Sequence, residues 1–318
     1  MKNGIQFSEE LLKLLSELPG VDFERLLESY NTPLPESIRI NTLKTTPSEC
    51  IEMLEENGFS LTKIPWTRYG YYVEPKDRIA ETLEHMLGLV YMQGPVSMLV
   101  AEVLDVKHGD RVLDLCAAPG SKSTQIGQYL ENSGALVAND ISYERIKALS
   151  SNLQRCGVVN VIITLKDGRM FGRRYPDTFD KVLVDAPCSS LGIISRDWSI
   201  AKRWRGRISE RMSRLQLGLI TSGFDALKPG GTLVYATCTL HPLENEWVID
   251  QLLERRSGKA KLLEIKIEGI KYSKPMVEWN GDFFHPEVSK CIRIYPYQSG
   301  AEGFFISKIT KTWADYEA

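Results

Sequence analysis

The fold is decided by the stretch R-V-L-D-L-C-A-A-P-G-S-K-S-T, residues 111–124. It begins with a short apolar run, continues through a loop of small residues, and opens into a helical pattern at about Ser121. The same order of apolar run, loop and helix recurs along the chain, with further apolar runs at residues 135–140, 161–165, 181–186 and 232–237. Short apolar strands that alternate with helices predict a parallel sheet covered on both faces.

We therefore expect an α/β fold with a doubly wound, Rossmann-like sheet, whose ligand lies at the carboxyl ends of the strands. Two β-rich stretches, residues 291–297 and 303–309, are expected to close this sheet as an antiparallel pair. Residues 266–290 mix turn and aromatic residues and predict a loop to which the sequence assigns no role.

Residues 1–92 predict a smaller α+β module ahead of a larger domain at 93–318. Ser8 is expected to cap a first helix, and a second amphipathic helix follows it. A β-α-β-β order is then expected from a strand at 37–43, a helix from Pro47 to about Gly58, and strands near 59–64 and 69–73.

Composition excludes several classes of protein. The 318 residues are 43% hydrophobic and 25% charged, as in an ordinary globular protein, and the net charge is −2. No apolar run reaches the ~18 residues of a membrane span, and the N-terminus does not resemble a signal peptide, so we expect a cytoplasmic protein that does not bind membranes. The six cysteines are scattered and the histidines number only four, which argues against a metal site and a disulfide framework.

The loop that follows residues 111–116 predicts a cofactor site, because small residues before a helix N-terminus let a ligand approach the backbone. A dinucleotide fingerprint needs three glycines, and only Gly120 is present. A Walker A loop fails as well, since Leu115 stands where its first glycine belongs and Lys122 comes one place late. S-adenosylmethionine remains, because it carries no phosphates and needs only small side chains in the loop.

Acidic residues end the next two apolar runs. Asp140 is placed to accept hydrogen bonds from two ribose hydroxyls, as acids at this position do in dinucleotide folds. The alternative is that Asp140 only caps the following helix. Asp167 and Gly168, past the third run, are expected near the adenine.

Two cysteines follow the ends of the fourth and fifth apolar runs, in the strings D-A-P-C-S-S (185–190) and A-T-C-T (236–239). A thiolate that adds to carbon 6 of cytosine makes carbon 5 nucleophilic toward a methyl donor. The reaction then needs a base for the carbon 5 proton and a protonated acid at N3. Cys188, Cys238 and Asp185 meet these needs, with Asp185 in an apolar setting that favours the protonated carboxyl, but the residues alone do not show which cysteine attacks.

Three strings resemble the Sun/Fmu (RsmB-like) family of S-adenosylmethionine-dependent RNA cytosine-5 methyltransferases: D-L-C-A-A-P-G-S-K-S-T-Q-I, D-A-P-C-S-S-L-G and A-T-C-T-L-H-P-L-E-N-E-W-V-I. The resemblance covers the larger domain from about Tyr91, and S-I-R-I-N-T-L-K resembles the N-terminal, RRM-like RNA-binding module of the family. It implies that Cys238 is the nucleophile and that Cys188 assists product release. It also implies cofactor contacts from Cys116, Ala117, Ala118, Pro119, Gly120, Ser121, Lys122, Asp140, Arg145, Asp167 and Asp185.

A basic stretch predicts contact with RNA phosphates. Residues 196–214 hold seven basic side chains against Asp197 and Glu210 (Arg196, Lys202, Arg203, Arg205, Arg207, Arg211 and Arg214). Their spacing predicts one helix with an arginine line facing solvent and an apolar line facing the core (Ile208, Met212, Leu215 and Leu219). Trp198 and Trp204 are expected among them, and the patch is expected to extend to Arg169, Arg173, Arg174, Arg39 and Lys44. A solvated helix face is the alternative.

These observations together predict a monomeric enzyme that methylates carbon 5 of cytosine in RNA. Transfer RNA is the expected substrate and ribosomal RNA the alternative. Amino-group methylation would call for an Asn-Pro-Pro-Tyr-like loop at residues 185–188 and would leave both cysteines without a role. A non-catalytic RNA-binding factor would have lost Asp185, Cys188 or Cys238, and all three are present.

Overall fold

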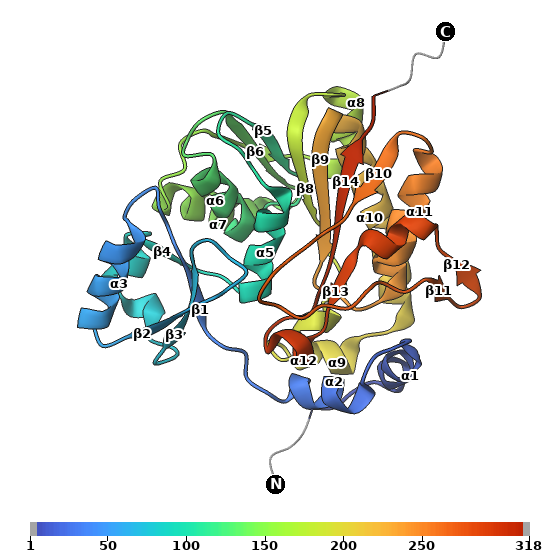
Figure 1. The fold of residues 1–318 in the computed structure, drawn as a ribbon, viewed down its shortest axis with the longest axis horizontal. Coiled ribbons are helices and arrows are strands. Elements are labelled where there is room, and N and C mark those ends of the chain that lie inside the picture. Colours follow the sequence, from blue (N-terminus) through green and yellow to red (C-terminus); the bar gives the residue numbers. More distant parts are fainter. Residues whose placement is uncertain (1–4, 314–318) are drawn as a thin grey trace.

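Five adjacent parallel strands make up most of a large sheet in the computed structural model, which describes residues 5–313 (Figure 1). The strand order is β10-β14-β9-β8-β5-β6-β7. The parallel strands are β5 (Arg111–Asp114), β6 (Ala135–Asp140), β7 (Val161–Leu165), β8 (Phe179–Asp185) and β9 (Leu227–Thr237). Each apolar run of the sequence is one of these strands, so the predicted doubly wound sheet is confirmed.

The antiparallel edge of this sheet is larger than expected. The predicted pair is present as β13 (Ile292–Ile294) and β14 (Phe304–Lys311). However, β14 also pairs with β9 on one side and with β10 (Ala260–Leu263) on the other. The sequence does not predict β10.

Helices cover both faces because successive strand residues point to opposite sides. On one face, Val112, Leu183 and Val234 pack beneath α5 (Pro95–Leu104), α6 (Ser121–Tyr129) and α7 (Tyr143–Arg155). On the other face, their neighbours Leu113, Val182 and Leu233 pack beneath α10 (Gly206–Ala226) and α11 (Glu246–Arg255). The alternation explains why the middle residues of β5, β8 and β9 are apolar on both faces.

The N-terminal region divides between two cores. A small sheet of order β2-β3-β1-β4 packs with α3 (Pro47–Glu56) around its own apolar cluster; its strands are β1 (Ser37–Ile40), β2 (Ser60–Lys63), β3 (Gly70–Glu74) and β4 (Val90–Met92). By contrast, α1 (Glu9–Glu17), capped by Ser8 as predicted, and α2 (Phe23–Tyr30) pack into the core of the larger domain. Figure 1 shows them beside α9 (Ser199–Arg203), away from the small sheet. The boundary at residue 92 remains a prediction.

Arg39 of β1 joins the small sheet to the larger domain. Its side chain is 1% exposed and donates hydrogen bonds to the Gln93 side chain, the Ser121 carbonyl and Thr124 Oγ1. The expectation that Arg39 contacts RNA is therefore wrong, because the side chain is buried and both terminal nitrogens donate within the protein.

Residues 266–290 contain more structure than the predicted loop. The segment forms a two-stranded hairpin of β11 (Glu278–Trp279) and β12 (Asp282–Phe283), and Ser273 bridges to Arg293. Within residues 5–313, no helix is both long and apolar enough for a membrane span.

Candidate active site

The strand order reverses between β5 and β8, and the loops that leave these two strands meet at this point. The loop after β5 carries residues 115–120 and leads into α6. Gly120, the residue before α6, has φ +112°, a conformation that a side chain would strain. An added Cβ would also lie 3.1 Å from Leu149 Cδ1, so the turn into the helix requires a glycine.

A cavity of about 420 Å³ opens over the carboxyl ends of these strands. Its lining includes the predicted cofactor residues Cys116, Ala118, Asp140, Arg145, Asp167, Gly168 and Asp185, together with both candidate catalytic cysteines. The other predicted cofactor residues, Ala117, Pro119, Gly120, Ser121 and Lys122, are not part of this lining. Asn139, Ile141, Ser190, Leu215 and Leu219 complete much of the wall and were not predicted.

Asp140 is almost fully buried at the cavity wall. Its side chain is 2% exposed, and its oxygens accept from the Ala118 and Ser142 amides, with Arg145 Nη1 3.4 Å away. Ser142, not Asp140, caps α7, so the structure does not favour the alternative of a helix cap. Each carboxylate oxygen can accept a further hydrogen bond, which leaves capacity for a ligand hydroxyl.

The two candidate cysteines meet although fifty residues separate them. Cys188 Sγ lies 3.2 Å from Cys238 Sγ, and Ser190 Oγ lies 3.7 Å from Cys238 Sγ. The hydrogen bond from the Cys188 thiol lowers the pKa of Cys238. The same hydrogen bond is the largest cause that raises the pKa of Cys188, and burial is the second largest. The pair therefore favours a thiolate at Cys238 and a thiol at Cys188.

Asp185 is not in the apolar setting that the sequence analysis expected. Its side chain is 31% exposed, and its Oδ2 accepts a hydrogen bond from Lys122 Nζ at 2.7 Å. Lys122 itself is buried and also donates to Ser97 Oγ at 3.1 Å. The cavity thus presents an acid that is paired with an ammonium group, close to the two sulfur atoms.

The sequence matches the profile of a family described as 16S rRNA methyltransferase RsmB/F over residues 101–310. The chain belongs to this methyltransferase family. Residues 5–95 also match the profile of the N-terminal domain of 16S rRNA methyltransferase RsmF. The predicted resemblance to the RsmB-like family is therefore confirmed, and with it the prediction that the chain is an enzyme.

Two relatives differ in their named substrates. A tRNA (cytosine(49)-C(5))-methyltransferase of Pyrococcus abyssi is 44% identical over 309 residues, which cover 96% of this chain and 97% of the relative. A ribosomal RNA small subunit methyltransferase F of Escherichia coli O81 is 38% identical over 327 residues, which cover 98% of this chain. The match spans only 65% of that second protein.

Solved structures agree with the fold of this methyltransferase. A methyltransferase homolog from Pyrococcus horikoshii superposes with a TM-score of 0.85 at 32% identity, over 97% of this chain and 96% of that one. A structure described as NSun6 from Pyrococcus horikoshii with SFG superposes with a TM-score of 0.84 at 25% identity, over 97% of this chain and 99% of that one.

The basic stretch of the methyltransferase is not one helix, because the chain breaks at Trp204 and Arg205 between α9 and α10. Trp204 was expected among the solvent-facing basic residues, but it is 3% exposed and packs on His241. Trp198 is exposed. The predicted apolar line does face the core in its second half, where Leu219 belongs to the main core and Leu215 packs against it. Leu215 and Leu219 line the active-site cavity, and Ile208 and Met212 are half-buried.

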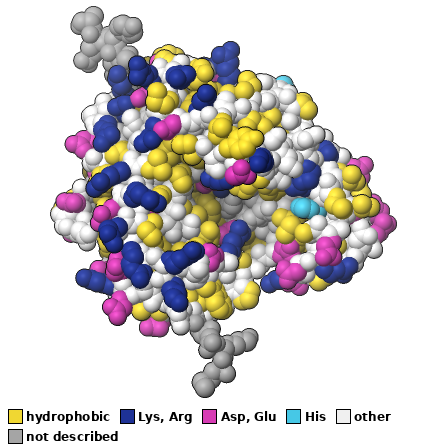
Figure 2. Space-filling view, turned by 180° about the vertical axis from the view of Figure 1, so that it is seen from behind, with side chains coloured by type: hydrophobic (Ala, Val, Ile, Leu, Met, Phe, Trp, Pro, Cys, Tyr) yellow, Lys and Arg dark blue, Asp and Glu magenta, His cyan; other side chains and the backbone are white. Residues whose placement is uncertain are grey.

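Several basic residues of this stretch have acidic partners. Arg196 pairs with Glu302, Arg203 with Asp197, and Arg205 with Glu10. Within the described part of the chain, Arg207, Arg211 and Arg214 have no such partner, and they line a groove of about 660 Å³ with Arg169, Glu210, Met212 and Leu215. Leu215 also lines the active-site cavity, so the groove and the cavity adjoin at this residue. Figure 2 shows the molecule from behind the view of Figure 1. Lys and Arg side chains gather on the half of that face where α10 lies.

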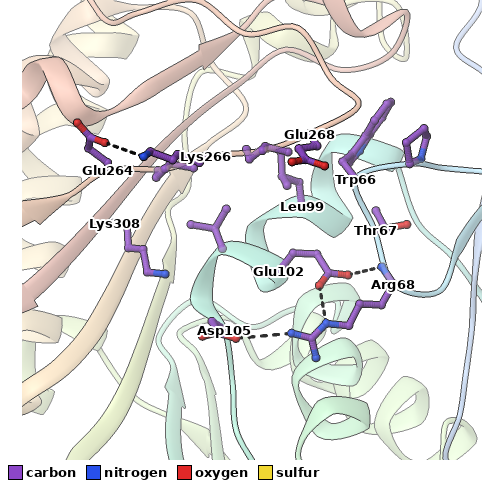
Figure 3. A pocket seen from close by; sticks show the side chains of 14 residues that line it. Trp66, Thr67, Arg68, Leu99, Glu102, Asp105, Glu264, Lys266, Glu268 and Lys308 are labelled. Atoms are coloured by element: carbon purple, nitrogen blue, oxygen red, sulfur yellow. Dashed lines mark hydrogen bonds and ion pairs between the residues drawn. The ribbon is translucent and has the colours of Figure 1, made fainter.

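A second large cavity, of about 580 Å³, lies between the small sheet and the larger domain (Figure 3). Arg68 spans it and pairs with Glu102 and Asp105 of the α5 region, while Lys308 faces it from β14. It contains none of the predicted site residues. The ion pairs of Arg68 connect the β2–β3 loop of the small sheet to the α5 region. The cavity therefore lies at the junction of two parts of the protein. Within residues 5–313, no cluster of three or more His, Cys, Asp or Glu side chains is arranged to hold a metal ion.

Proposed function

We propose that this methyltransferase transfers a methyl group from S-adenosylmethionine to carbon 5 of cytosine in RNA, with transfer RNA as the substrate. The observation that carries the proposal is the pair of sulfur atoms 3.2 Å apart in the cavity wall. A single nucleophile would explain one cysteine, whereas a second thiol beside it provides the base that this reaction needs. The tRNA-specific name of the Pyrococcus abyssi relative, which matches along nearly its whole length, favours transfer RNA over ribosomal RNA.

The cavity suits S-adenosylmethionine on chemical grounds. Asp140 would accept hydrogen bonds from the ribose hydroxyls, while Cys116 and Ala118 leave room for the ligand beside the backbone. Asp167 and Gly168 would border the adenine, and Arg145 would close the side of the cavity next to Asp140. When bound, the cofactor supplies the methyl group that carbon 5 accepts.

The Asp140 carboxylate gives a direct test of this site. Replacing it with asparagine is expected to weaken cofactor binding by about tenfold to a hundredfold, since hydrogen bonds to a charged group contribute about 1.5–3 kcal/mol. Titration calorimetry with S-adenosylmethionine measures the effect. Glu144→Gln, an exposed carboxylate on α7 outside the cavity, is the matched control. Equal affinities for the Asp140→Asn and parent proteins would exclude Asp140 as a ribose ligand.

Cys238 is the nucleophile in this proposal. Its thiolate adds to carbon 6, and the electron pair of the carbon 5–carbon 6 double bond moves into the ring toward N3. Lys122 and Asp185 together deliver a proton to N3, since Asp185 is the exposed member of the pair and Lys122 holds a proton 2.7 Å from it.

Cys188 is the base that completes the reaction. The main cause of the raised pKa of Cys188 is its hydrogen bond to Cys238. Once the Cys238 sulfur is bonded to carbon it is no longer an anion, so this cause disappears and the pKa of Cys188 falls. Cys188 gives up its own proton to solvent in the open cavity, and N3 returns its proton to the Lys122–Asp185 pair as carbon 5 attacks the methyl group. The Cys188 thiolate then takes the proton from carbon 5. The electrons of that C–H bond restore the double bond, and Cys238 leaves as a thiolate.

RNA would reach the cavity through the groove of Arg207, Arg211 and Arg214. Replacing Arg211 with alanine is expected to weaken RNA binding about three- to tenfold and to lower the salt dependence of binding by about one released ion. Filter binding at several salt concentrations measures both. Arg255→Ala, an exposed arginine on α11 away from this groove, serves as the control. An unchanged salt slope for Arg211→Ala would argue that the groove does not contact phosphates.

Bisulfite sequencing of total RNA tests the proposed function. RNA from a strain that lacks the gene should lose 5-methylcytosine at one or more transfer RNA positions, and purified protein should restore them in vitro. Loss confined to ribosomal RNA would support the alternative substrate. An unchanged 5-methylcytosine map would overturn the proposal.

A further inference from the structure

Three consecutive polar side chains behind the cysteines are fully buried. Glu244 ends a short 3-10 turn, Asn245 links it to α11, and Glu246 begins that helix; all three are 0% exposed. Burying polar groups is unfavourable unless hydrogen bonds replace those to water. The partners of these residues therefore show what their burial stabilises.

Glu244 holds the loop that carries Cys188. Its Oε2 accepts from the Ser189 amide at 2.9 Å and from Gln216 Nε2 at 3.0 Å, and its Oε1 accepts from Ser189 Oγ at 2.5 Å. Gln216 Nε2 also donates to the Pro187 carbonyl at 2.8 Å. The residues on both sides of Cys188 are thus connected to one buried carboxylate.

Asn245 holds the loop that carries Cys238. Its Oδ1 accepts from Thr237 Oγ1 at 2.6 Å, and its Nδ2 donates to the Thr239 carbonyl at 3.0 Å. These contacts lie immediately before and after Cys238 in the chain.

Glu246 holds the segment behind the site instead. It accepts from Arg293 and from the Met276 amide, and Arg293 Nη1 donates to the Leu240 carbonyl at 2.8 Å. This ion pair is fully buried and lies outside the cysteine loops, so Glu246 is not assigned a role in placing either sulfur.

We propose that Glu244 and Asn245 are positioning residues that fix the two cysteines separately, Glu244 through the Cys188 loop and Asn245 through the Cys238 loop. Because the two side chains are neighbours on one stretch of backbone, they help to set the distance between the sulfur atoms, together with the hydrogen bond between Ser189 Oγ and Thr239 Oγ1. A displacement of about 1 Å in a reacting group can lower a rate by about 10²-fold. The inference rests on the proposed function for the roles of the cysteines, but not for their placement.

Alkylation of single cysteines tests the placement without RNA. Glu244→Gln should change the iodoacetamide rate of Cys188, measured by peptide mass spectrometry in a Cys238→Ala background, by about threefold or more. It should leave the rate of Cys238, measured in a Cys188→Ala background, unchanged. Asn245→Asp removes the donor to Thr239 and should produce the reverse pattern. Glu254→Gln, an exposed carboxylate later on α11, should alter neither rate. Equal changes at both cysteines, or none, would overturn the inference whatever the cysteines do in catalysis.

Covalent adduct levels then test the consequence. With both cysteines present, Glu244→Gln should raise the fraction of enzyme bound covalently to RNA at steady state, because release slows. Asn245→Asp should lower it, because formation slows. A general loss of structure would lower the adduct in both variants. If the alkylation rates separate but the adduct levels do not, the placement stands and the proposed roles of Cys188 and Cys238 fail.

Discussion

Replacing Cys238 with alanine is expected to abolish methyl transfer, with a fall in kcat of about 10⁴-fold or more, because it removes the sulfur that bonds to carbon 6. The structure identifies Cys238 as the more acidic thiol, since the hydrogen bond from Cys188 lowers its pKa. Incorporation of labelled methyl groups into transfer RNA measures the loss. Affinity for RNA should change little, because the exposed arginines of α10 remain.

A matched cysteine separates this effect from general damage. Cys50 is buried in the core of the small sheet, far in the fold from the cavity, and Cys50→Ala should keep full kcat even if it lowers the melting temperature. A Cys238→Ala protein with kcat near that of the parent would refute covalent catalysis at this residue.

Replacing Cys188 with alanine is expected to trap the enzyme on its RNA. Addition by Cys238 and methylation of carbon 5 need no base, but release does, so the adduct accumulates on a denaturing gel. The variant should also show a higher pKa for Cys238, because it loses the hydrogen bond that lowers it. Adduct formation should therefore shift to higher pH: a raised pKa reduces the thiolate at neutral pH and restores it only above the new value.

The control for Cys188→Ala is the double variant Cys188→Ala, Cys238→Ala, which should form no adduct. If adduct appears with Cys238→Ala alone and not with Cys188→Ala, the two roles are reversed. That outcome would place the nucleophile in the loop after β8.

Most of the larger domain was predictable because its strands are short apolar runs that alternate with helical patterns. Residues 135–140 and 161–165 were predicted with the bounds of β6 and β7. In contrast, β10 alternates buried and exposed residues over only four positions, a signal too short to distinguish from a loop. The burial of α1 and α2 against the larger domain depends on contacts between distant segments, which local periodicity does not report.

The sequence predicted which residues lie at the site, but it did not predict which side chains pair with one another there. Loops that follow adjacent parallel strands must meet, so the proximity of Cys188 and Cys238 follows from the strand order. The pairing of Lys122 with Asp185 depends on where a long side chain points across α6, and the sequence indicated a cofactor contact instead. A sequence also does not show where the Arg39 side chain points. It was therefore expected to bind RNA, whereas the structure shows a buried hydrogen-bond donor.

The sequence alone does not assign a role to Glu244 or Asn245. The string L-E-N-E lies between an apolar strand and an amphipathic helix, where three polar residues in a row usually face solvent. Only the structure shows that they are buried against the two cysteine loops.

The most direct test of covalent catalysis by Cys238 is to identify the residue joined to RNA in the Cys188→Ala protein. The trapped complex would be digested with nuclease and protease, and the peptide that carries a nucleotide sequenced by mass spectrometry. The predicted result is a methylated cytidine nucleotide on the sulfur of Cys238. A nucleotide on any other residue would contradict the account, as would an RNA-free protein under conditions in which the parent enzyme methylates the same RNA.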